Sequence, residues 1–496
     1  MKVLYVCTEL APLMKTGGLA DVGSALPPAL TAAGCETRLL LPAFPSIVAG
    51  VDLDEGAALT PEGPCSPPVL QHMTVPARIR LGRVTSTGQP VYLLQASELY
   101  LRDGGPYQDA TGHDWPDNAA RFALLGWAAA WLGLGGDPHW QPDVMHAHDW
   151  HAALAPLYLR QMAGDAARPV SVFTVHNLAY QGLFPAQALP ETGLPWSVFT
   201  MEGLEFYGQM SFMKAGLQFA DAITTVSPRY AREIMTAAQG CGLDGVLRER
   251  ADHVSGILNG VDYALWDPAT DPMISARYDS SHLAGKALAR SALQRELGLE
   301  ERPDARVFGV VSRLTAQKGL QLLPPVVDGL VERGGQLVIL GNGEPIIESA
   351  LRKALTTHPT QAAFRTGYDE ALAHRIIAGA DVLLVPSQFE PCGLTQLYAM
   401  RYGTLPLVHG VGGLADTVTD ADADGLAGGR ATGFVFHRFD VEALRAALQR
   451  VFDLTCQPPV WAAVQRQAMQ RRFDWREAAL AYRTLFEELI HRRDAA

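Results

Sequence analysis

The chain has 496 residues, of which 48% are hydrophobic and 19% charged, and its 40 basic and 52 acidic side chains give a net charge of −12. This length is enough for two or three domains with full hydrophobic cores. The negative charge opposes a general attraction to nucleic acid or anionic membranes, so we expect neither as a partner. The sequence has no long uncharged apolar run, and no transmembrane helix is expected.

The N-terminus is typical of a first strand and not of a signal peptide, because Glu9 and Lys15 interrupt its apolar stretch. Six cysteines are scattered without CxxC spacing, which indicates neither a zinc site nor a disulfide framework. We therefore expect a cytoplasmic protein with no structural metal.

Short apolar runs rich in β-branched residues alternate with helix-length segments along the chain. In the first half, strands are predicted at Val3–Thr8, Thr37–Leu41, Val91–Gln95, Asp143–His146, Ser171–Val175, Ala222–Val226 and Val254–Leu258. In the second half, they are predicted at Val307–Val311, Leu337–Leu340, Asp381–Val385, Leu405–Val408 and Gly433–Phe436. Continuous apolar strands are typical of parallel sheets covered on both faces. The pattern predicts an α/β protein with two doubly wound domains and a crevice between them.

The segment Asp262–Lys286, rich in Asp, Pro, Ser and Ala, is predicted to be the interdomain linker. The expected domains are residues 1–262 and 263–474. Within residues 475–496, Trp475–Arg493 has the apolar spacing of an amphipathic helix.

The pentapeptide Gly-Gly-Leu-Ala-Asp occurs at Gly17–Asp21 and again at Gly412–Asp416, each time between a strand-like and a helix-like run. A helix that opens on glycine lets the backbone approach a ligand and aims unpaired N–H groups at it, which favours phosphate. The alternative is that each Gly-Gly pair only makes a tight turn.

Polar and glycine clusters follow the carboxyl ends of the predicted strands. They are Lys15-Thr16-Gly17-Gly18, His146–His151, His176-Asn177, Asn259–Asp262, Ser312-Arg313, Gly341–Glu344 and Glu390–Gly393. Ligands of open α/β sheets bind beyond these strand ends, so we expect the clusters to form one site.

Arg313 and Lys318 are spaced to clamp a diphosphate and to neutralise a leaving group, although a solvated helix start is the alternative. The sequence lacks a Walker A motif and a GxGxxG after its first strand, which argues against P-loop enzymes and dinucleotide oxidoreductases. A nucleotide diphosphate that carries one sugar is the remaining candidate ligand. Residues available to hold the sugar are Asp149, His176, Asn177, Asn259 and Glu390.

Three histidines, His146, His148 and His151, invite a zinc interpretation. Strand geometry places His146 and His148 on one face and His151 in the following turn, which favours sugar contacts or buried hydrogen bonds. Cys392 either packs beside a glycine turn or contacts a ligand. Tyr368 either stacks on a nucleobase or is structural.

An ordered set of motifs resembles the bacterial glycogen synthases and plant starch synthases over nearly the whole chain. The motifs are Lys15–Val22, His148–His151, Thr174–Gly182, Ser312–Leu314 with Lys318-Gly319, and Glu390–Gln396. The resemblance implies the GT-B fold, in which two Rossmann-like domains face a central cleft. It also implies a retaining transferase that moves glucose from ADP-glucose to the non-reducing end of an α-1,4-glucan such as glycogen, with no metal or other cofactor.

The resemblance also implies site residues. On the N-terminal side, which takes sugar and acceptor, it assigns Lys15, Gly17 and Gly18 to the distal phosphate and glucose, Asp149 and His176 to the reaction centre, and Asn259 to a sugar hydroxyl. On the C-terminal, nucleotide side, it assigns Arg313 and Lys318 to the diphosphate, Tyr368 to the adenine side, Glu390 to glucose hydroxyls, and the backbone of Cys392, Gly393, Leu394 and Thr395 to the phosphates. The final helix is expected to cross back to the N-terminal domain.

Some residues depart from relatives. Tyr398 stands eight residues after Glu390, where many wider GT-B relatives have a second glutamate, which leaves ribose recognition unassigned. Gly23 stands where the family commonly has a branched apolar residue.

The residues bear on three rival functions. The first is a UDP-sugar or ADP-sugar transferase that acts on a small acceptor, which would be a glycosyltransferase of the same class with a different donor or acceptor. A non-enzymatic glucan-binding protein is opposed by the presence of Lys15, Arg313, Lys318 and Glu390. A glucan phosphorylase is opposed by the lack of a lysine in a context for pyridoxal phosphate.

Overall fold

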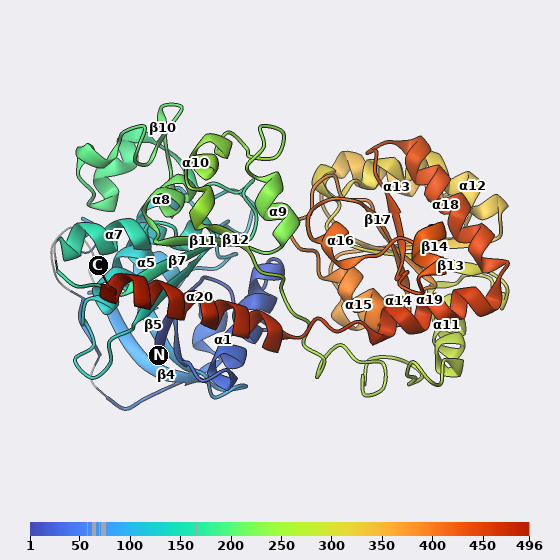
Figure 1. The fold of residues 1–496 in the computed structure, drawn as a ribbon, viewed down its shortest axis with the longest axis horizontal. Helices are drawn as coiled ribbons and strands as arrows, with labels where there is room; N and C mark the ends of the chain where they lie inside the picture. The colour runs from blue at the N-terminus through green and yellow to red at the C-terminus, as the bar shows by residue number, and fades with distance from the viewer. Residues whose placement is uncertain (57, 62–65, 69, 71–75, 165, 496) are drawn as a thin grey trace. The chain divides into compact units, whose positions relative to one another are not determined.

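The computed structural model describes residues 1–496 except 57, 62–65, 69, 71–75, 165 and 496. The chain divides into two compact units, which are drawn in Figure 1. Unit 1 is Met1–Gly260 with Trp475–Ala496, and unit 2 is Val261–Asp474. Among the described residues, no helix is long and apolar enough to cross a membrane.

Unit 1 is built on a nine-stranded sheet in the order β12-β11-β7-β6-β1-β2-β5-β4-β3. Its strands are β1 (Lys2–Val6), β2 (Glu36–Pro42), β3 (Val51–Leu53), β4 (Arg78–Val84), β5 (Pro90–Gln95), β6 (Val144–His148), β7 (Val170–Val175), β11 (Ala222–Thr225) and β12 (Val254–Gly256). The strands from β12 to β5 pair in parallel, which confirms the strands predicted for this half.

Two features of unit 1 were not predicted. β3 and β4 continue the sheet in antiparallel register beyond β5. A separate three-stranded antiparallel sheet contains β8 (Leu183–Pro185), β9 (Glu205–Phe206) and β10 (Gln209–Ser211). Both escape a pattern search because their strands are short or carry charges at alternating positions.

The helices of unit 1 cover the sheet. They are α1 (Gly18–Ala32), α2 (Pro45–Val48), α4 (Ser97–Tyr100), α5 (Asn118–Gly133), α6 (Asp149–Ala152), α7 (Ala155–Ala163), α8 (Phe212–Phe219), α9 (Pro228–Glu233), α10 (Asp244–Glu249) and α20 (Trp475–Ala495), with the 3₁₀ turns η1 (Ala186–Thr192), η2 (Trp196–Val198) and η3 (Ala251–His253). α5 is buried along almost its whole length, as expected of a helix that is apolar on all faces.

The amphipathic helix predicted at the end of the chain is present as α20. Its apolar side chains, among them Tyr482, Phe486 and Leu489, join the core of unit 1. α20 lies beside α1 (Figure 1), and the Arg483 guanidinium donates to the carbonyl of Ala33 at the end of α1.

Unit 2 has a six-stranded parallel sheet in the order β15-β14-β13-β16-β17-β18. Its strands are β13 (Arg306–Val311), β14 (Gly335–Gly341), β15 (Ala362–Thr366), β16 (Val382–Val385), β17 (Leu405–His409) and β18 (Phe434–Phe436). Its helices are α11 (Ala284–Leu297), α12 (Val327–Glu332), α13 (Pro345–Leu355), α14 (Glu370–Gly379), α15 (Thr395–Arg401), α16 (Gly412–Thr417), α17 (Ala423–Ala427), α18 (Val441–Thr455) and α19 (Pro458–Gln470), with the 3₁₀ turns η4 (Ala316–Lys318), η5 (Leu320–Leu322) and η6 (Pro324–Val326). The strands predicted here are confirmed, and β15 was missed.

The prediction that Asp262–Lys286 is a linker is wrong, because this segment packs into unit 2. The Trp266 ring stacks between His374, 3.7 Å away, and Tyr398, 4.0 Å away. The buried Asp271 carboxylate accepts hydrogen bonds from the Tyr402 hydroxyl at 2.6 Å and the His374 ring at 2.7 Å. The polar composition hid the few aromatic and acidic side chains that anchor the segment.

We expect Trp266→Ala to destabilise unit 2 by about 3–5 kcal/mol, because the variant leaves a cavity between two stacked rings. Thermal unfolding monitored by near-ultraviolet circular dichroism measures the loss. Leu288→Ala on α11 is the matched control, since Leu288 is exposed. Equal melting temperatures for Trp266→Ala and the control would contradict the anchoring role.

Candidate active site

Three neighbouring strands of unit 1, β1, β6 and β7, end at the same edge of the sheet and present acidic and imidazole groups there. Glu9 follows β1, Asp149 follows β6 and His176 follows β7. Because parallel strands share one carboxyl edge, the loops that carry these residues are brought together. We call this group the unit 1 half-site.

Asp149 stands directly after His148 in a strained backbone conformation, with φ of 56°. Its Oδ1 accepts the N–H of His176 at 2.8 Å and, more weakly, the N–H of Asn177 at 3.4 Å. The pKa of the carboxyl group is raised to about 7, mainly by burial and to a smaller extent by the nearby Glu9 charge, while the two backbone N–H bonds act in the opposite direction. A strained, buried carboxyl group that titrates near neutrality is typical of a functional position.

Glu9 organises the loop that precedes α1. Its carboxylate accepts the N–H groups of Thr16 and Gly17, the Thr16 hydroxyl and the Tyr107 hydroxyl. N–H groups at the start of α1 were predicted to face a phosphate, and those of Thr16 and Gly17, just before the helix, bind Glu9. Lys15 pairs with Asp21 at 2.8 Å across the same loop.

Buried histidines lie beneath the half-site. His148 Nδ1 and His176 Nε2 are 2.9 Å apart in one hydrogen bond, and His146 Nε2 bonds the Thr174 hydroxyl. The His151 ring stacks on Tyr107 with centroids 4.3 Å apart. Among the described residues, no group of three or more His, Cys, Asp or Glu side chains is arranged to hold a metal ion. The histidines make buried hydrogen bonds and ring contacts, as the sequence favoured.

These histidines predict an acid-labile unit 1. Burial lowers the pKa of His146 and of His176 to about 3, and it holds the pKa of His148 and His151 well below the usual value of about 6.5. A depressed histidine pKa contributes stability above pH 6.5 that is lost as the pH falls, because the unfolded chain binds those protons first. Asp149 acts in the opposite direction. Between about pH 4 and 7 its carboxyl group is protonated in the folded protein but ionised in the unfolded chain. Four histidines against one aspartate leave a net difference of three protons, which corresponds to about 4 kcal/mol of lost stability per pH unit near pH 5.

Urea unfolding between pH 8 and 5 measures this loss. His146→Gln should reduce the pH slope by about one proton, since the amide still reaches Thr174 and does not titrate. Stability that stays constant down to pH 5 would refute the interpretation.

In unit 2, the loops after β13 and β16 are joined around an ion pair. Lys318 Nζ lies 2.6 Å from Glu390 Oε2, which also accepts the Ser387 hydroxyl at 2.9 Å. The Gln388 N–H donates to the carbonyl of Gln317, which ties the two loops together. Glu390 is 6% exposed, so its charge is balanced mainly by Lys318. We call these residues with Arg313 the unit 2 half-site.

A glycine makes this ion pair possible. Gly319 has φ of 70°, and a Cβ there would stand 1.9 Å from the carbonyl oxygen of Pro386. Only glycine allows the backbone after Lys318 to approach the β16 loop this closely. Arg313, directly after β13, is exposed.

The glycines of the second Gly-Gly-Leu-Ala-Asp copy make close backbone contacts with the loop that carries Glu390. The Gly413 N–H donates to the carbonyls of Glu390 and Pro391, and a Cβ on Gly412 would lie 1.9 Å from the Glu390 oxygen. This glycine pair therefore lets α16 pack against the Glu390 loop.

The remaining predicted residues of unit 2 lie in two places, with Cys392 to Thr395 directly beyond Glu390 and Tyr368 beyond β15. Cys392 is buried, and the next residue, Gly393, has a φ of 71°. The Gln396 side-chain amide donates to the carbonyls of both residues. α15 begins at Thr395, after Leu394. Tyr368 is 65% exposed and follows the edge strand β15. Tyr398 stacks on Trp266, so it fills a packing role where wider relatives have an acid.

Asn259 lies apart from the other unit 1 residues. It is buried after β12, at the end of the sheet, and β11 separates that strand from β7. Unit 1 therefore joins Asp149 with His176 and holds the Lys15-to-Gly18 loop through Glu9. Glu9 and Tyr107 were missed as site residues. The position of Glu9 directly after the first strand was the available signal.

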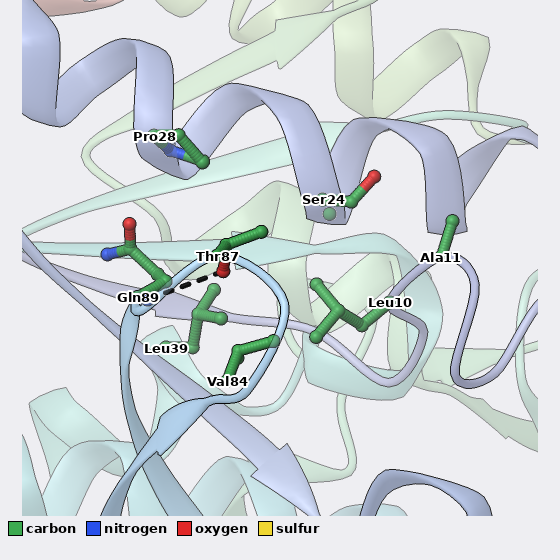
Figure 2. A pocket seen from close by; sticks show the side chains of 9 residues that line it. Leu10, Ala11, Ser24, Pro28, Leu39, Val84, Thr87 and Gln89 are labelled. Carbon is green, nitrogen blue, oxygen red and sulfur yellow. Dashed lines mark hydrogen bonds between the residues drawn. The ribbon is translucent and has the colours of Figure 1, made fainter. Parts of the chain in front are cut away.

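A small cavity lies in unit 1, and Figure 2 shows it between α1 and the turn that joins β4 to β5. Its lining is mostly apolar, from Leu10, Ala11, Leu39 and Val84, with Gly23 on α1. The Gln89 side chain donates to the carbonyl of Thr37 at 2.6 Å, so this polar group is already satisfied. The cavity contains none of the predicted site residues.

Comparisons with known proteins match both units. Residues 2–249 match the family model of the starch synthase catalytic domain, and residues 296–463 match the model of group 1 glycosyl transferases. Glycogen synthases of Albidiferax ferrireducens and Leptothrix cholodnii are 56% and 53% identical to the chain. These alignments cover 99% of this chain in both cases, and 99% and 100% of the relatives.

Two solved structures are similar over 99% of each chain. The catalytic domain of starch synthase IV from Arabidopsis thaliana, bound to ADP and acarbose, has a TM-score of 0.86 and 30% identity. A sucrose-phosphate synthase from Thermosynechococcus elongatus has a TM-score of 0.59 and 18% identity, and it shares the fold.

The two α/β units, each built on parallel strands, and these matches define a GT-B glycosyltransferase, and the activity is that of a hexosyltransferase. Such an enzyme takes a nucleotide-sugar donor and a glucan acceptor. The chain belongs to the glycogen synthase family, as the sequence motifs predicted.

Proposed function

We propose that the chain transfers glucose from ADP-glucose to the non-reducing end of an α-1,4-glucan, with retention of configuration. The observation that carries the proposal is the Lys318–Glu390 pair, with Arg313 in the same loop after β13 as Lys318 and Glu390 in the loop after the neighbouring strand β16. This half-site offers two cations to a diphosphate and a carboxylate to sugar hydroxyls.

The leaving group of the reaction is ADP, which gains negative charge as the bond to glucose breaks. Arg313 and Lys318 stabilise that charge, Arg313 with a planar fork and Lys318 as a point charge. The Cys392-to-Thr395 backbone and Tyr368 are assigned to the phosphates and the adenine side. Because Lys318 is paired with Glu390 before substrate binds, the side chain is already held in place for the diphosphate.

The unit 1 half-site is assigned the reacting glucose. Asp149 and His176 lie together through the hydrogen bond from the His176 N–H, so one backbone arrangement positions both. A carboxylate near the anomeric carbon stabilises an oxocarbenium-like centre. Lys15, Gly17 and Gly18 are assigned to the distal phosphate and glucose, and Asn259 to a sugar hydroxyl.

The choice of ADP-glucose is supported by the ADP found in the Arabidopsis structure, and the α-glucan acceptor by the names of the bacterial relatives. A cytoplasmic location is supported by the free cysteines Cys7, Cys35, Cys241 and Cys456, and Cys65 lies outside the described residues.

The test is donor turnover with glycogen. Purified protein receives ADP-glucose or UDP-glucose, and release of the nucleotide diphosphate and elongation of the glucan are measured. We expect turnover with ADP-glucose that exceeds turnover with UDP-glucose at least tenfold, and an α-anomeric product. Preference for UDP-glucose, or elongation of small glycosides but not of glycogen, would overturn the proposal.

A further inference from the structure

Glu9 is buried, at 2% exposure, and its carboxylate is the acceptor on which the loop before α1 is built. Its Oε2 accepts the N–H of Thr16 at 2.7 Å and of Gly17 at 3.3 Å. Its Oε1 accepts the Thr16 hydroxyl and the Tyr107 hydroxyl, each at 2.6 Å. Four donors thus converge on one carboxylate, which is the geometry that holds a buried charge in a fixed position.

These bonds fix the loop that opens α1. The helix begins after Gly17, which has no side chain with which to cap it. Glu9 therefore supplies the cap from a different part of the chain, and its charge lies at the positive end of the helix dipole. The next N–H, that of Gly18, has no hydrogen-bond partner among the described residues. The loop is held at two amides while the third stays available.

Glu9 is itself held by close packing. A Cβ on Gly23 would stand 2.5 Å from the Glu9 carbonyl oxygen, so the glycine lets α1 approach the main chain at Glu9. Tyr107, which donates to Glu9, stacks on His151 in α6, two residues after Asp149. One carboxylate thus connects the loop at Lys15–Gly18 with the element that carries Asp149.

We infer that Glu9 is a positioning residue for the donor, which acts by holding the Lys15–Gly18 loop so that the Gly18 N–H and the Lys15 ammonium meet the nucleotide sugar. The inference rests on the proposed function. Gly23 belongs to the same device, because it permits the contact of α1 with Glu9.

Three variants test the inference. Glu9→Ala removes all four bonds. Glu9→Gln should restore most of them, because its amide oxygen accepts the two N–H groups while its NH₂ donates to the two hydroxyls, which reverse their roles. Gly23→Ala leaves the carboxylate intact and displaces the backbone of Glu9. Glu36→Ala on β2 is the control, since Glu36 is exposed and pairs with Lys2 at the start of β1, whereas Glu9 lies beyond the end of that strand.

The readouts are amide hydrogen exchange of a peptide that covers residues 15–18, ADP affinity by calorimetry, and the kinetic constants for ADP-glucose and glycogen. In Glu9→Ala we expect exchange at least tenfold faster, a dissociation constant for ADP about tenfold higher, and kcat/KM for the donor about 10- to 100-fold lower. KM for glycogen should stay within twofold. Glu9→Gln should lie within about fivefold of the wild type, and Gly23→Ala between the two.

Unchanged exchange in Glu9→Ala overturns the inference, and so does faster exchange with unaltered ADP affinity. A Glu9→Gln variant as impaired as Glu9→Ala also overturns it, because the charge and not the position would then matter. If the wild type turns over no ADP-glucose, the proposed function fails. Exchange and ADP binding still decide the role of Glu9 in that case.

Discussion

Replacing Lys318 by alanine is expected to lower kcat by about 10²- to 10³-fold, and replacing Arg313 by alanine to lower it by a similar factor. Each residue supplies positive charge to the departing diphosphate, and one donor aimed at developing charge contributes about 3–4 kcal/mol to the transition state. Steady-state kinetics with ADP-glucose and glycogen measure the effect. KM for glycogen should change little, because neither residue is assigned to the acceptor.

The control for this pair is Lys353→Ala on α13, an exposed lysine of the same unit. Lys318→Ala also leaves the buried Glu390 carboxylate without its cation, so thermal stability is measured in parallel. A folded Lys318→Ala protein with nearly normal turnover, together with a nearly normal Arg313→Ala protein, would remove the diphosphate assignment.

Asp149→Asn is expected to lower kcat by at least about 100-fold and at the same time to stabilise the protein at alkaline pH. The loss of activity follows from removing a negative charge beside the developing oxocarbenium centre. In the wild type, kcat/KM should fall below about pH 7, where the carboxyl group becomes protonated. The variant should lack this acid limb.

The gain in stability follows from the raised pKa. The folded protein binds this proton up to about pH 7, whereas the unfolded chain loses it near pH 4. The contribution of this proton to the free energy of unfolding is on the order of 4 kcal/mol. It is complete below about pH 4 and is lost as the pH rises to 7. Asparagine keeps an oxygen for the His176 N–H and never ionises, so it avoids the loss.

Urea unfolding at pH 4.5 and pH 8 compares the stability of the wild type with that of Asp149→Asn, and Asp252→Asn, at an exposed position, is the control. The Asp149→Asn protein should exceed the wild type in stability at pH 8 and approach it at pH 4.5. Full activity in this variant, or lower stability than the wild type at pH 8, would contradict the role of a buried, ionisable carboxyl group.

The sheets were predictable because buried parallel strands are continuous apolar runs, such as Val307–Val311, and need no information from the rest of the chain. β15 was missed because Arg365 and Thr366 end it in polar residues at the sheet edge. The segment 262–286 was misread for a similar reason. Its composition is that of a loop, but Trp266 is buried by partners more than 100 residues away.

The two Gly-Gly-Leu-Ala-Asp copies show the limit of local patterns. Both are identical in sequence, yet in the first copy a carboxylate binds the N–H of the first glycine, Gly17, whereas in the second copy backbone carbonyls bind the N–H of the second glycine, Gly413. Neither pairing can be read from the pentapeptide, because the partners Glu9 and Glu390 come from other loops. The Lys318–Glu390 pair also joins residues that are 72 positions apart.

The amino-acid sequence by itself determined the fold class, the strands of both sheets and the family, because these depend on local apolar periodicity and on motifs that stand contiguously in the chain. Only the tertiary structure decided which charges meet. Hydrogen bonds and ion pairs depend on distances of about 3 Å between groups that the chain brings together from separate strand ends. For this reason Glu9, whose neighbours in sequence say nothing of Thr16 or Tyr107, emerged as an organising residue only in the folded protein.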